Sequence, residues 1–298
     1  MKLKIGYFAD GPWAHRAFEK IIGDDSIEVC FMCVRYDKND AILMEYASKY
    51  KIPLLIHSNI NEIEFIDILK EFHTDLFVSM SFNQIFKDTI MQIPRFGIIN
   101  CHAGKLPFYR GRNILNWVLI NDEKEFGITV HYVDYGIDTG DIILQRTFNI
   151  TDIDTYATLL ERAYNECAEI LYDAIKLIQN DEVKAIKQTT IDPVGFYCGM
   201  RQGGDEIIDW NQSSREIFNF IRALTEPGPK ATAYLKGKEM KIICARMVAG
   251  AHVYKNTIGQ VVGKTNNTFF VKTSDTILEI TEYEYDGSVV IGDRFDKN

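Results

Sequence analysis

Long hydrophobic runs are missing from this sequence. Nowhere do about 18 apolar residues follow one another, as a membrane-spanning helix requires. The N-terminal residues reach Asp10 and Gly11 too soon to contain the apolar region of a signal peptide. We therefore expect a cytoplasmic protein that has no membrane partner.

An excess of positive charge is missing too. The 298 residues contain 33 Lys and Arg against 42 Asp and Glu, which gives a net charge of −9. From Arg201 onward basic and acidic residues balance at 13 each, so residues 1–200, with 20 basic and 29 acidic, carry the whole excess. Because binding to long nucleic acids requires clustered cations, this composition argues against a nucleic-acid partner.

Two other absences exclude further classes of protein. Cys30 and Cys33 have the spacing of a redox or zinc pair, but they lie in an apolar run and no second pair follows. We therefore expect two packed side chains and no metal. No G-x-G-x-x-G follows the first expected strand, which disfavours a hydride-transferring enzyme that binds a dinucleotide.

The first half of the chain alternates between strand and helix periodicity. This alternation predicts a Rossmann-like α/β fold, in which helices cover both faces of a mostly parallel sheet and ligands bind at the carboxyl ends of the strands. Asp10 is the expected N-cap of the first helix. The expected strands are 2–9, 27–34, 54–56, 76–80 and 97–100, and the expected helices are 13–22, 41–50 and 60–72.

The composition changes after a long helix expected at 155–179. Asp192-Pro193 and Gly203-Gly204 mark a linker, and the residues from Ala231 onward contain short strands separated by turns. Several short strands in under seventy residues predict a small β domain of the OB type. The expected organisation is a catalytic domain at 1–190, a linker at 191–203 and an OB-like domain at 204–298.

One group of polar residues stands at the end of an expected strand. Asn100 and His102 are two residues apart, so their side chains leave on the same face, and Asp138 lies in a turn that follows another strand. An amide can stabilise an oxyanion, an imidazole can move a proton, and a carboxylate can orient the imidazole. These are the groups that acyl transfer requires when no covalent enzyme intermediate forms.

The motifs around these residues resemble a known family. N-x-H at Asn100, L-P-x-x-x-G from Leu106, G-x-T-x-H from Gly127 and D-x-G at Asp138 occur in the order found in formyltransferases that use 10-formyltetrahydrofolate. Ile208-Asp209-Trp210 is similar to the start of that family's C-terminal domain. The resemblance therefore covers most of the chain.

The resemblance implies a role for each residue of the group. Asn100 would donate to the formyl oxygen, His102 would act as general base and acid while an amine attacks the formyl carbon directly, and Asp138 would orient His102. His131 is expected to support the site from its strand. The resemblance also implies that 10-formyltetrahydrofolate binds two segments, which contain Phe82, Asn83, Gln84, Ile85 and Phe86, and Val133, Asp134 and Gly136.

Family resemblance leaves the acceptor amine open. Methionyl-tRNA formyltransferases have a basic insertion after the second strand and a basic C-terminal domain, whereas residues 35–41 are short and mixed in charge here. The sequence around Tyr109 and Trp117 is closer to enzymes that formylate nucleotide-linked amino sugars, which we expect as the substrate. The expected substrate-binding residues are Trp13, Lys105, Tyr109, Arg110, Arg112, Asn113 and Arg201.

The sequence leaves two alternative functions and the oligomeric state open. The first alternative is a methionyl-tRNA formyltransferase. The second, of another class, is a folate- or nucleotide-binding protein without catalytic activity, since a fold does not fix a function. Relatives that modify sugars are often dimers, so the resemblance is compatible with a homodimer.

Overall fold

The computed structural model describes residues 2–296, which form two compact units. In this part of the chain no helix is both long and apolar enough to cross a membrane. The units interleave in sequence, so the division into 1–190, 191–203 and 204–298 stays a prediction. The first unit contains the described residues up to Arg112, Phe126–Phe148 and Glu161–Cys198, and the second contains Asn113–Glu125, Asn149–Leu160 and the described residues from Gly199.

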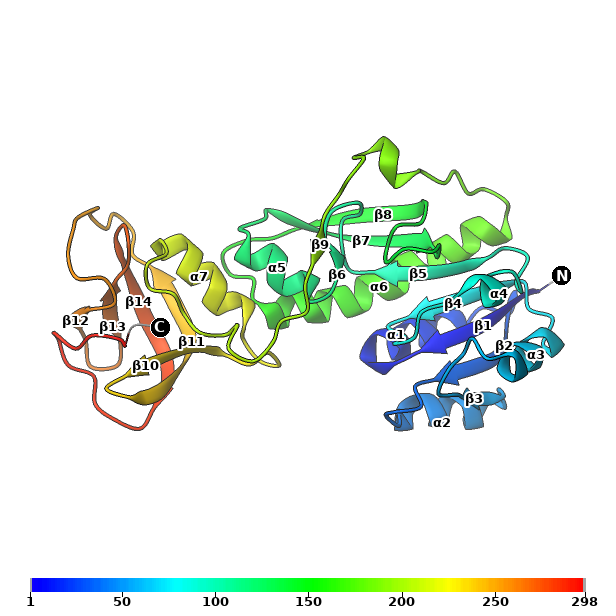
Figure 1. Ribbon diagram of the computed structural model, residues 1–298, viewed down its shortest axis with the longest axis horizontal. Helices are drawn as coiled ribbons and strands as arrows, with labels where there is room; N and C mark the ends of the chain where they lie inside the picture. The colour runs from blue at the N-terminus through cyan, green and yellow to red at the C-terminus, as the bar shows by residue number, and fades with distance from the viewer. Residues whose placement is uncertain (1, 297–298) are drawn as a thin grey trace. The chain divides into compact units, whose positions relative to one another are not determined.

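A seven-stranded sheet forms the centre of the first unit (Figure 1), with the strand order β3-β2-β1-β4-β5-β7-β8. The strands from β3 to β5 are parallel to one another, whereas β7 is antiparallel to β5. The expected mostly parallel sheet is therefore confirmed. Its strands are β1 (Leu3–Ala9), β2 (Ile27–Val34), β3 (Leu54–Ile56), β4 (Leu76–Met80), β5 (Ile98–His102), β7 (Glu125–Tyr132) and β8 (Ile142–Asn149).

Two consecutive residues of β1 show why helices cover both faces of this sheet. Tyr7 packs against Phe18 of α1 with ring centroids 6.0 Å apart. Phe8 points to the opposite face, where it shares a buried cluster with Phe65 of α3. The helices are α1 (Gly11–Ile21), α2 (Ala41–Tyr50), α3 (Ile63–Glu71), α4 (Asp88–Met91), α6 (Tyr156–Gln179) and the 3₁₀ turn η1 (Gln188–Thr190).

The N-terminus of α1 lies where expected, with Asp10 as N-cap residue, but its side-chain bonding differs from that of a usual cap. The Asp10 carboxylate makes no capping bond and instead accepts a hydrogen bond from Arg35 at 3.1 Å. The Gly11 amide donates to Asp40 at 2.9 Å, and the same carboxylate caps α2 by accepting from the amide of Leu43 at 3.1 Å. Asp10 is therefore the N-cap residue as expected, but its side chain makes no capping bond, because the chain after β2 brings Arg35 and Asp40 to this helix end.

A closed antiparallel sheet forms the larger part of the second unit, with the order β10-β11-β14-β13-β12. Phe295 bridges Leu235 of β10, and Arg294 bridges Gln260 just before β12, so one segment joins both edges. This closure agrees with the expected OB-like domain. The elements of this unit include α5 (Ile114–Ile120), α7 (Ser214–Ala223), β10 (Ala231–Leu235), β11 (Lys238–Met247), β12 (Val261–Lys264), β13 (Phe269–Lys272) and β14 (Ile277–Tyr285).

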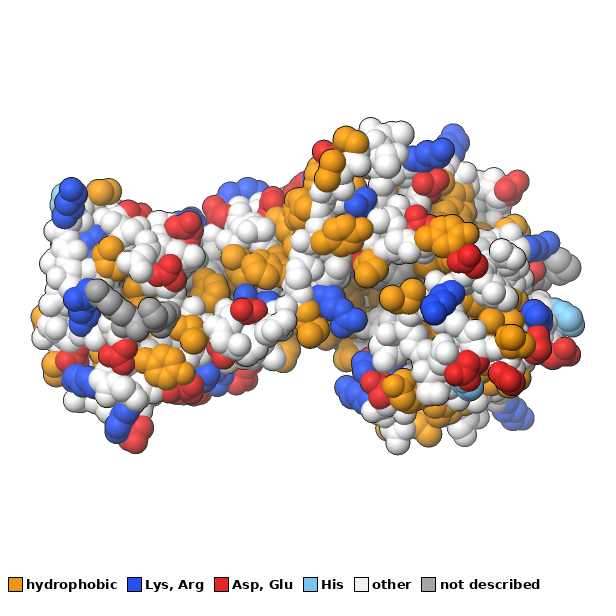
Figure 2. Space-filling model, viewed as in Figure 1, with side chains coloured by type: hydrophobic (Ala, Val, Ile, Leu, Met, Phe, Trp, Pro, Cys, Tyr) orange, Lys and Arg blue, Asp and Glu red, His pale blue; other side chains and the backbone are white. Residues whose placement is uncertain are grey.

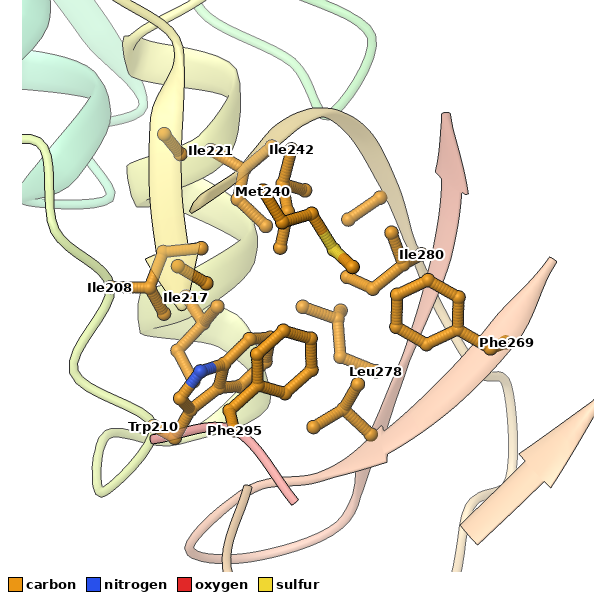
Figure 3. Packing of buried hydrophobic residues seen from close by; sticks show 14 of the residues in the cluster. Ile208, Trp210, Ile217, Ile221, Met240, Ile242, Phe269, Leu278, Ile280 and Phe295 are labelled. Carbon is orange, nitrogen blue, oxygen red and sulfur yellow. The ribbon is translucent and has the colours of Figure 1, made fainter. Parts of the chain in front are cut away.

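Aliphatic side chains together with a few aromatic rings form the core of the closed sheet (Figure 3). Trp210 stacks on Phe295 with ring centroids 4.7 Å apart, and Phe269 packs edge-on against Tyr283 at 5.0 Å. Ile217 of α7 is buried in the same cluster. This packing gives the second unit its own hydrophobic core.

Candidate active site

Two neighbouring strands position the amide and both imidazoles of the site. Asn100 and His102 lie two residues apart on β5 and point to one face, and His131 lies opposite Asn100 on β7. The Asn100 Nδ2 is 3.3 Å from His131 Nε2. The expected supporting position of His131 is therefore what the geometry shows.

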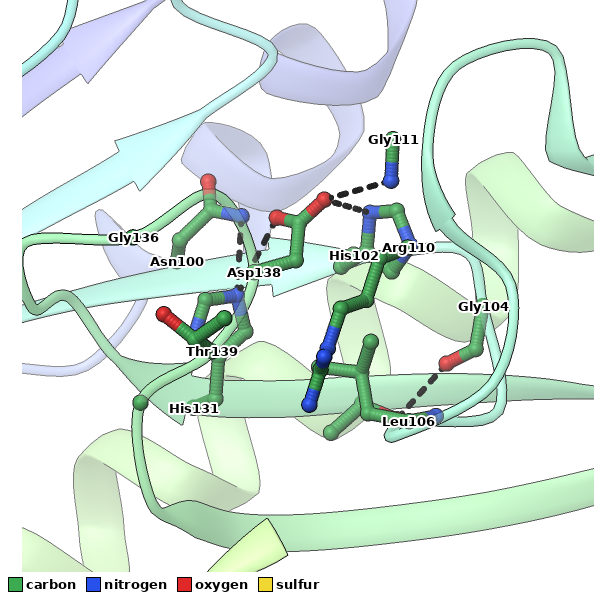
Figure 4. A network of polar contacts seen from close by, with 12 residues as sticks. Asn100, His102, Gly104, Leu106, Arg110, Gly111, His131, Gly136, Asp138 and Thr139 are labelled. Atoms are coloured by element: carbon green, nitrogen blue, oxygen red, sulfur yellow. Dashed lines mark hydrogen bonds and ion pairs between the residues drawn. The ribbon is translucent and has the colours of Figure 1, made fainter. Parts of the chain in front are cut away.

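Asp138 reaches these side chains from the loop that connects β7 to β8 (Figure 4). Its Oδ2 lies 3.5 Å from His102 Nδ1, and its Oδ1 lies 3.5 Å from His131 Nε2. The backbone amide of Gly111 donates to Oδ2 at 2.9 Å. The structure thus brings together the three residues that the sequence nominated as catalytic.

The hydrogen bonds assign the protons of both imidazoles. His102 Nε2 lies 2.7 Å from the Tyr109 carbonyl oxygen, which can only accept, so Nε2 carries a proton and Nδ1 is the basic nitrogen of neutral His102. His131 Nδ1 donates in the same way to the Tyr132 carbonyl at 2.7 Å. Its Nε2 can therefore accept from Asn100, whose second N–H is left for a ligand.

Burial controls the charges of this group. Burial raises the pKa of Asp138, but the positive charge that His102 and His131 can carry and the hydrogen bond from the Gly111 amide outweigh it and bring that pKa to about 2. Burial lowers the pKa of His102 below 6.5, although Asp138 acts in the opposite direction. At neutral pH the site therefore combines a carboxylate with a neutral imidazole, the state that a general base requires.

The two phenylalanines expected to contact folate are part of the hydrophobic core. The Phe82 and Phe86 rings lie edge-on against Phe8, with centroids 5.4 and 5.0 Å from it. Phe86 is buried, whereas Phe82 is half-buried. Packing therefore accounts for Phe86 completely and leaves part of Phe82 accessible.

The polar residues of the same segment hold the loop after β4. The Gln84 carboxamide accepts from the Ile60 amide at 2.9 Å and so fixes this loop to its neighbour. Asn83 Nδ2 lies 3.4 Å from Asp37, while Asn83 Oδ1 is buried without a hydrogen-bond partner among the described residues. Ile85 is 65% exposed. Asn83 Oδ1 and Ile85 therefore join the accessible part of Phe82 as side-chain groups of this segment that a ligand could contact.

The second expected folate segment forms the start of the loop that carries Asp138. The Val133 amide donates to Ile98 at the edge of β5. The Asp134 carboxylate accepts from the Gly136 amide at 3.1 Å and from the Thr139 hydroxyl at 2.5 Å, which closes the turn. These three expected residues therefore shape the loop through contacts within the chain.

The expected substrate-binding residues of the first unit lie in different environments. The Arg110 guanidinium is buried and donates to Gln188 and to the Val194 carbonyl, so the protein itself occupies its hydrogen-bonding groups. Tyr109 is also buried, and its carbonyl rather than its side chain contacts His102. Arg112 is exposed.

The two remaining expected residues of this unit have local partners. Trp13 packs edge-on against Tyr164 with ring centroids 4.6 Å apart. Lys105 is half-buried and lies so close to Gly127 that a Cβ at Gly127 would overlap with it. Neither environment identifies a substrate by itself.

Asn113 and Arg201 meet in the second unit, where both line a cavity of about 380 Å³. The Arg201 amide donates to Asn113 Oδ1 at 3.0 Å. The Arg201 guanidinium lies over the rings of Trp117 and Phe220, at 5.7 and 5.5 Å from their centroids. These aromatic contacts, and a hydrogen bond to the Asp205 carbonyl, hold the Arg201 guanidinium within the second unit.

Several groups that complete the site could not be identified from the sequence. The Tyr109 carbonyl and the Gly111 amide act through the backbone, which residue identities do not reveal. Gln188 also contacts the loop of Asp138, although no motif marks it. Among residues 2–296, no group of three or more His, Cys, Asp or Glu side chains is arranged to hold a metal ion.

Comparisons with known proteins agree with this geometry. Residues 24–175 match the family model described as formyl transferase, and residues 202–292 match the formyl transferase C-terminal domain. The chain is 31% identical over 300 residues to the methionyl-tRNA formyltransferase of Alkaliphilus oremlandii, with 98% of this chain and 95% of the relative covered.

Two further relatives are similar to this chain. The bifunctional polymyxin resistance protein ArnA of Wigglesworthia glossinidia brevipalpis is 35% identical over 246 residues, covering 83% of this chain but 36% of that protein's length. The solved structure of WlaRD, a sugar 3N-formyl transferase in the presence of dTDP and 5-N-formyl-THF, has a TM-score of 0.71 and 25% identity. That match covers 95% of this chain and 98% of WlaRD.

Proposed function

Because the chain belongs to the formyl transferase family and is therefore an N-formyltransferase, we propose that it transfers a formyl group from 10-formyltetrahydrofolate to the amine of a nucleotide-linked amino sugar. His102 is the general base and acid, Asn100 the oxyanion donor, and Asp138 the residue that orients His102. The observation that carries this proposal is the convergence of the three side chains within the region that matches the family model.

The protonation state of His102 defines its part in the reaction. Since the Tyr109 carbonyl holds Nε2–H, Nδ1 takes the proton that the amine loses as it attacks the formyl carbon. Asp138, 3.5 Å from Nδ1, stabilises the resulting imidazolium. The same Nδ1 then returns a proton to the nitrogen from which the formyl carbon departs, so no further base is needed.

Asn100 acts on the formyl oxygen. One N–H of its amide donates to His131, which fixes the orientation of the side chain. The other N–H donates to the oxygen as negative charge develops on it in the tetrahedral transition state. Donors of this kind contribute roughly 3 to 4 kcal/mol to transition-state stabilisation in other acyl-transfer enzymes.

The loop after β4 suits the folate. 10-Formyltetrahydrofolate supplies the formyl group, bound to a nitrogen that leaves on transfer. The buried acceptor Asn83 Oδ1, which has no partner within residues 2–296, would be satisfied by a donor of the pterin ring. We assign the pterin to main-chain groups of 82–86 and of 133–136, with Asn83 as a side-chain contact.

The charge distribution supports a small anionic acceptor. The C-terminal residues from Arg201 are neutral overall, and the face seen in Figure 2 mixes acidic and basic side chains without a broad field of one sign. Two phosphates of a nucleotide need two or three cations, and we propose the exposed Arg112 of the first unit as one of them. A tRNA would need many more.

Methionyl-tRNA is the second candidate acceptor. It is favoured by the match to the A. oremlandii enzyme, which extends over 98% of this chain at 31% identity. Other methionyl-tRNA formyltransferases match at 34% identity over most of this chain. Because sequence similarity and charge favour different acceptors, the choice requires a direct measurement.

The test offers both acceptors under the same conditions. Purified protein is incubated with 10-formyltetrahydrofolate and either dTDP- and UDP-linked amino sugars or methionyl-tRNA, and release of tetrahydrofolate is followed. We expect turnover with at least one amino sugar and loss of that turnover in His102→Asn, whereas His252→Asn, which alters an exposed imidazole in the second unit, leaves it unchanged.

Each outcome of this test identifies one function. Turnover with methionyl-tRNA and none with amino sugars overturns the proposed acceptor but keeps the chemistry. Binding of folate without turnover on any acceptor supports the non-catalytic alternative and overturns the proposed reaction.

A further inference from the structure

A buried glutamine connects the loop of Asp138 to a segment far along the chain. Gln188 in η1 is 2% exposed, and its Nε2 donates to the backbone carbonyls of Asp138 and Gly140, both at 2.8 Å. Its Oε1 accepts two hydrogen bonds from Arg110, at 2.7 and 3.1 Å. All four bonds of the carboxamide are therefore used.

Arg110 is itself held on several sides. Its third nitrogen donates to the Val194 carbonyl at 3.1 Å, and its guanidinium lies over the Tyr197 ring. The backbone of β6 (Arg110–Gly111) pairs with β9 (Tyr197–Cys198). Residues 188–198, which we call the strap, thus anchor both the Asp138 loop and the Gly111 amide that binds its carboxylate.

The Asp138 loop needs such an anchor. Asp138 has a φ of 55°, in the left-handed region that residues with a side chain seldom adopt. The loop also exposes Tyr135 and Ile137, at 79% and 56%, and therefore has little apolar burial of its own. Gly140 lies so close to the Tyr132 carbonyl that a Cβ there would overlap with it. The hydrogen bonds from Gln188 hold the backbone carbonyls of Asp138 and Gly140, the two positions with a constrained backbone.

We propose that Gln188, supported by Arg110, is a positioning residue that holds the Asp138 carboxylate between His102 and His131. The inference rests on the role of Asp138 in the proposed function. It assigns Arg110 to the same task, in place of the substrate contact expected from the sequence. The strap then determines whether the catalytic group is assembled, acting through the Asp138 loop and the Gly111 amide.

Gln188→Glu removes the two donors while keeping the acceptor for Arg110. The carboxylate that this substitution introduces would pair with the Arg110 guanidinium, which supports folding, but it would face the carbonyls of Asp138 and Gly140 with oxygen. We expect kcat to fall on the order of 10- to 100-fold with KM for donor and acceptor nearly unchanged, because a displacement of about 1 Å in a catalytic group has effects of this size.

A matched control separates positioning from general loss of stability. Gln179, which is half-buried, donates one hydrogen bond to the Ser26 carbonyl at 3.0 Å and accepts from Lys176, so it joins a backbone carbonyl to a cation as Gln188 does, but far from the Asp138 loop. Gln179→Glu should leave kcat unchanged, with its melting temperature measured beside that of Gln188→Glu.

A double-mutant cycle tests whether Arg110 acts through Gln188. Arg110→Lys keeps the charge but cannot bind Gln188 and Val194 together, so we expect a smaller fall in kcat. Combined with Gln188→Glu, it should have less than additive effect, because both changes release the same loop. If Arg110 contacted substrate directly, Arg110→Lys would raise KM for the acceptor and leave kcat unchanged. That result would overturn the assignment of Arg110 as a support of Gln188.

A readout independent of turnover keeps the inference separate from the proposed function. In Gln188→Met, which adds no charge, NMR titration of His102 should give a lower midpoint than in the wild type, because the displaced carboxylate no longer favours the imidazolium. If the wild type turns over no acceptor, the proposed function fails and this titration still judges the positioning. An unchanged midpoint, or kcat within twofold of wild type in Gln188→Glu, refutes the inference.

Discussion

Replacing Asp138 by Asn measures how strongly the carboxylate supports His102. Both side chains are about nine-tenths buried, and Asp138 Oδ2 lies 3.5 Å from His102 Nδ1. At that separation two unit charges interact by about 1 kcal/mol in water and about 5 kcal/mol at an effective dielectric constant of 20. Since one pKa unit corresponds to about 1.4 kcal/mol, Asp138→Asn should lower the pKa of His102 by roughly 1 to 3 units.

The same interaction sets the expected loss of rate. If 1 to 5 kcal/mol of imidazolium stabilisation is lost in the transition state, kcat falls by roughly tenfold to a few thousandfold. General acid–base catalysis by a positioned side chain contributes roughly a hundredfold to ten thousandfold. The two ranges overlap between about a hundredfold and a few thousandfold, which is the decrease we expect for Asp138→Asn.

The assay is a pH profile of kcat with saturating formyl donor and acceptor. Asp138 is ionised over the whole range because its pKa is about 2, so the acid limb reports protonation of His102. Burial lowers the pKa of His102, which places the wild-type limb below pH 6.5, and in Asp138→Asn the limb moves further toward acid.

A control and a clear contrary result complete this test. Asp75→Asn alters another mostly buried carboxylate of the first unit, paired with Arg95 at 2.9 Å, and should leave both kcat and the profile unchanged. An acid limb that stays in place or moves toward alkaline pH in Asp138→Asn, or kcat within threefold of wild type, would show that Asp138 does not act through His102.

Two further substitutions test the geometry of the site and the core of the second unit. In Gly104→Ala the new Cβ would overlap with His102 Nε2 and the Tyr109 carbonyl, so we expect kcat to fall roughly 10- to 100-fold in a folded protein, measured beside its circular dichroism spectrum. Normal turnover in Gly104→Ala would contradict the hydrogen bond assigned between His102 Nε2 and the Tyr109 carbonyl. Phe269→Ala empties a fully buried position and should reduce the free energy of unfolding in urea by about 3 to 5 kcal/mol, whereas a loss below about 1 kcal/mol would argue against the packing seen in Figure 3.

Local periodicity was sufficient to predict most elements of the first unit. The expected helix at 41–50 and the expected strands at 54–56 and 76–80 coincide with α2, β3 and β4. A strand of period 2 or a helix of period 3.6 is encoded by the residues within it, so a single sequence reveals it. The same argument placed Asn100 and His102 on one face of β5.

Contacts between distant segments were not predictable in this way. Asp10 is a favourable capping residue, yet the chain after β2 brings Arg35 to it and gives the Gly11 amide to Asp40. Arg110, next to the catalytic motif, looks like a substrate contact in sequence, but the fold places Gln188 against it. Residue type defines which bonds a side chain can make, while the partner depends on which segments meet.

The sequence by itself determined the chemical groups of this protein: an amide and an imidazole two residues apart on a strand, a carboxylate in a later turn, and a C-terminal region without net charge. Tertiary structure alone decided their working state. The Tyr109 carbonyl assigns the proton of His102, the Gly111 amide and both imidazoles keep Asp138 ionised, and Gln188 anchors its loop. Proton positions and pKa values depend on burial and on partners brought from distant parts of the chain, and these exist only once the sheet has formed.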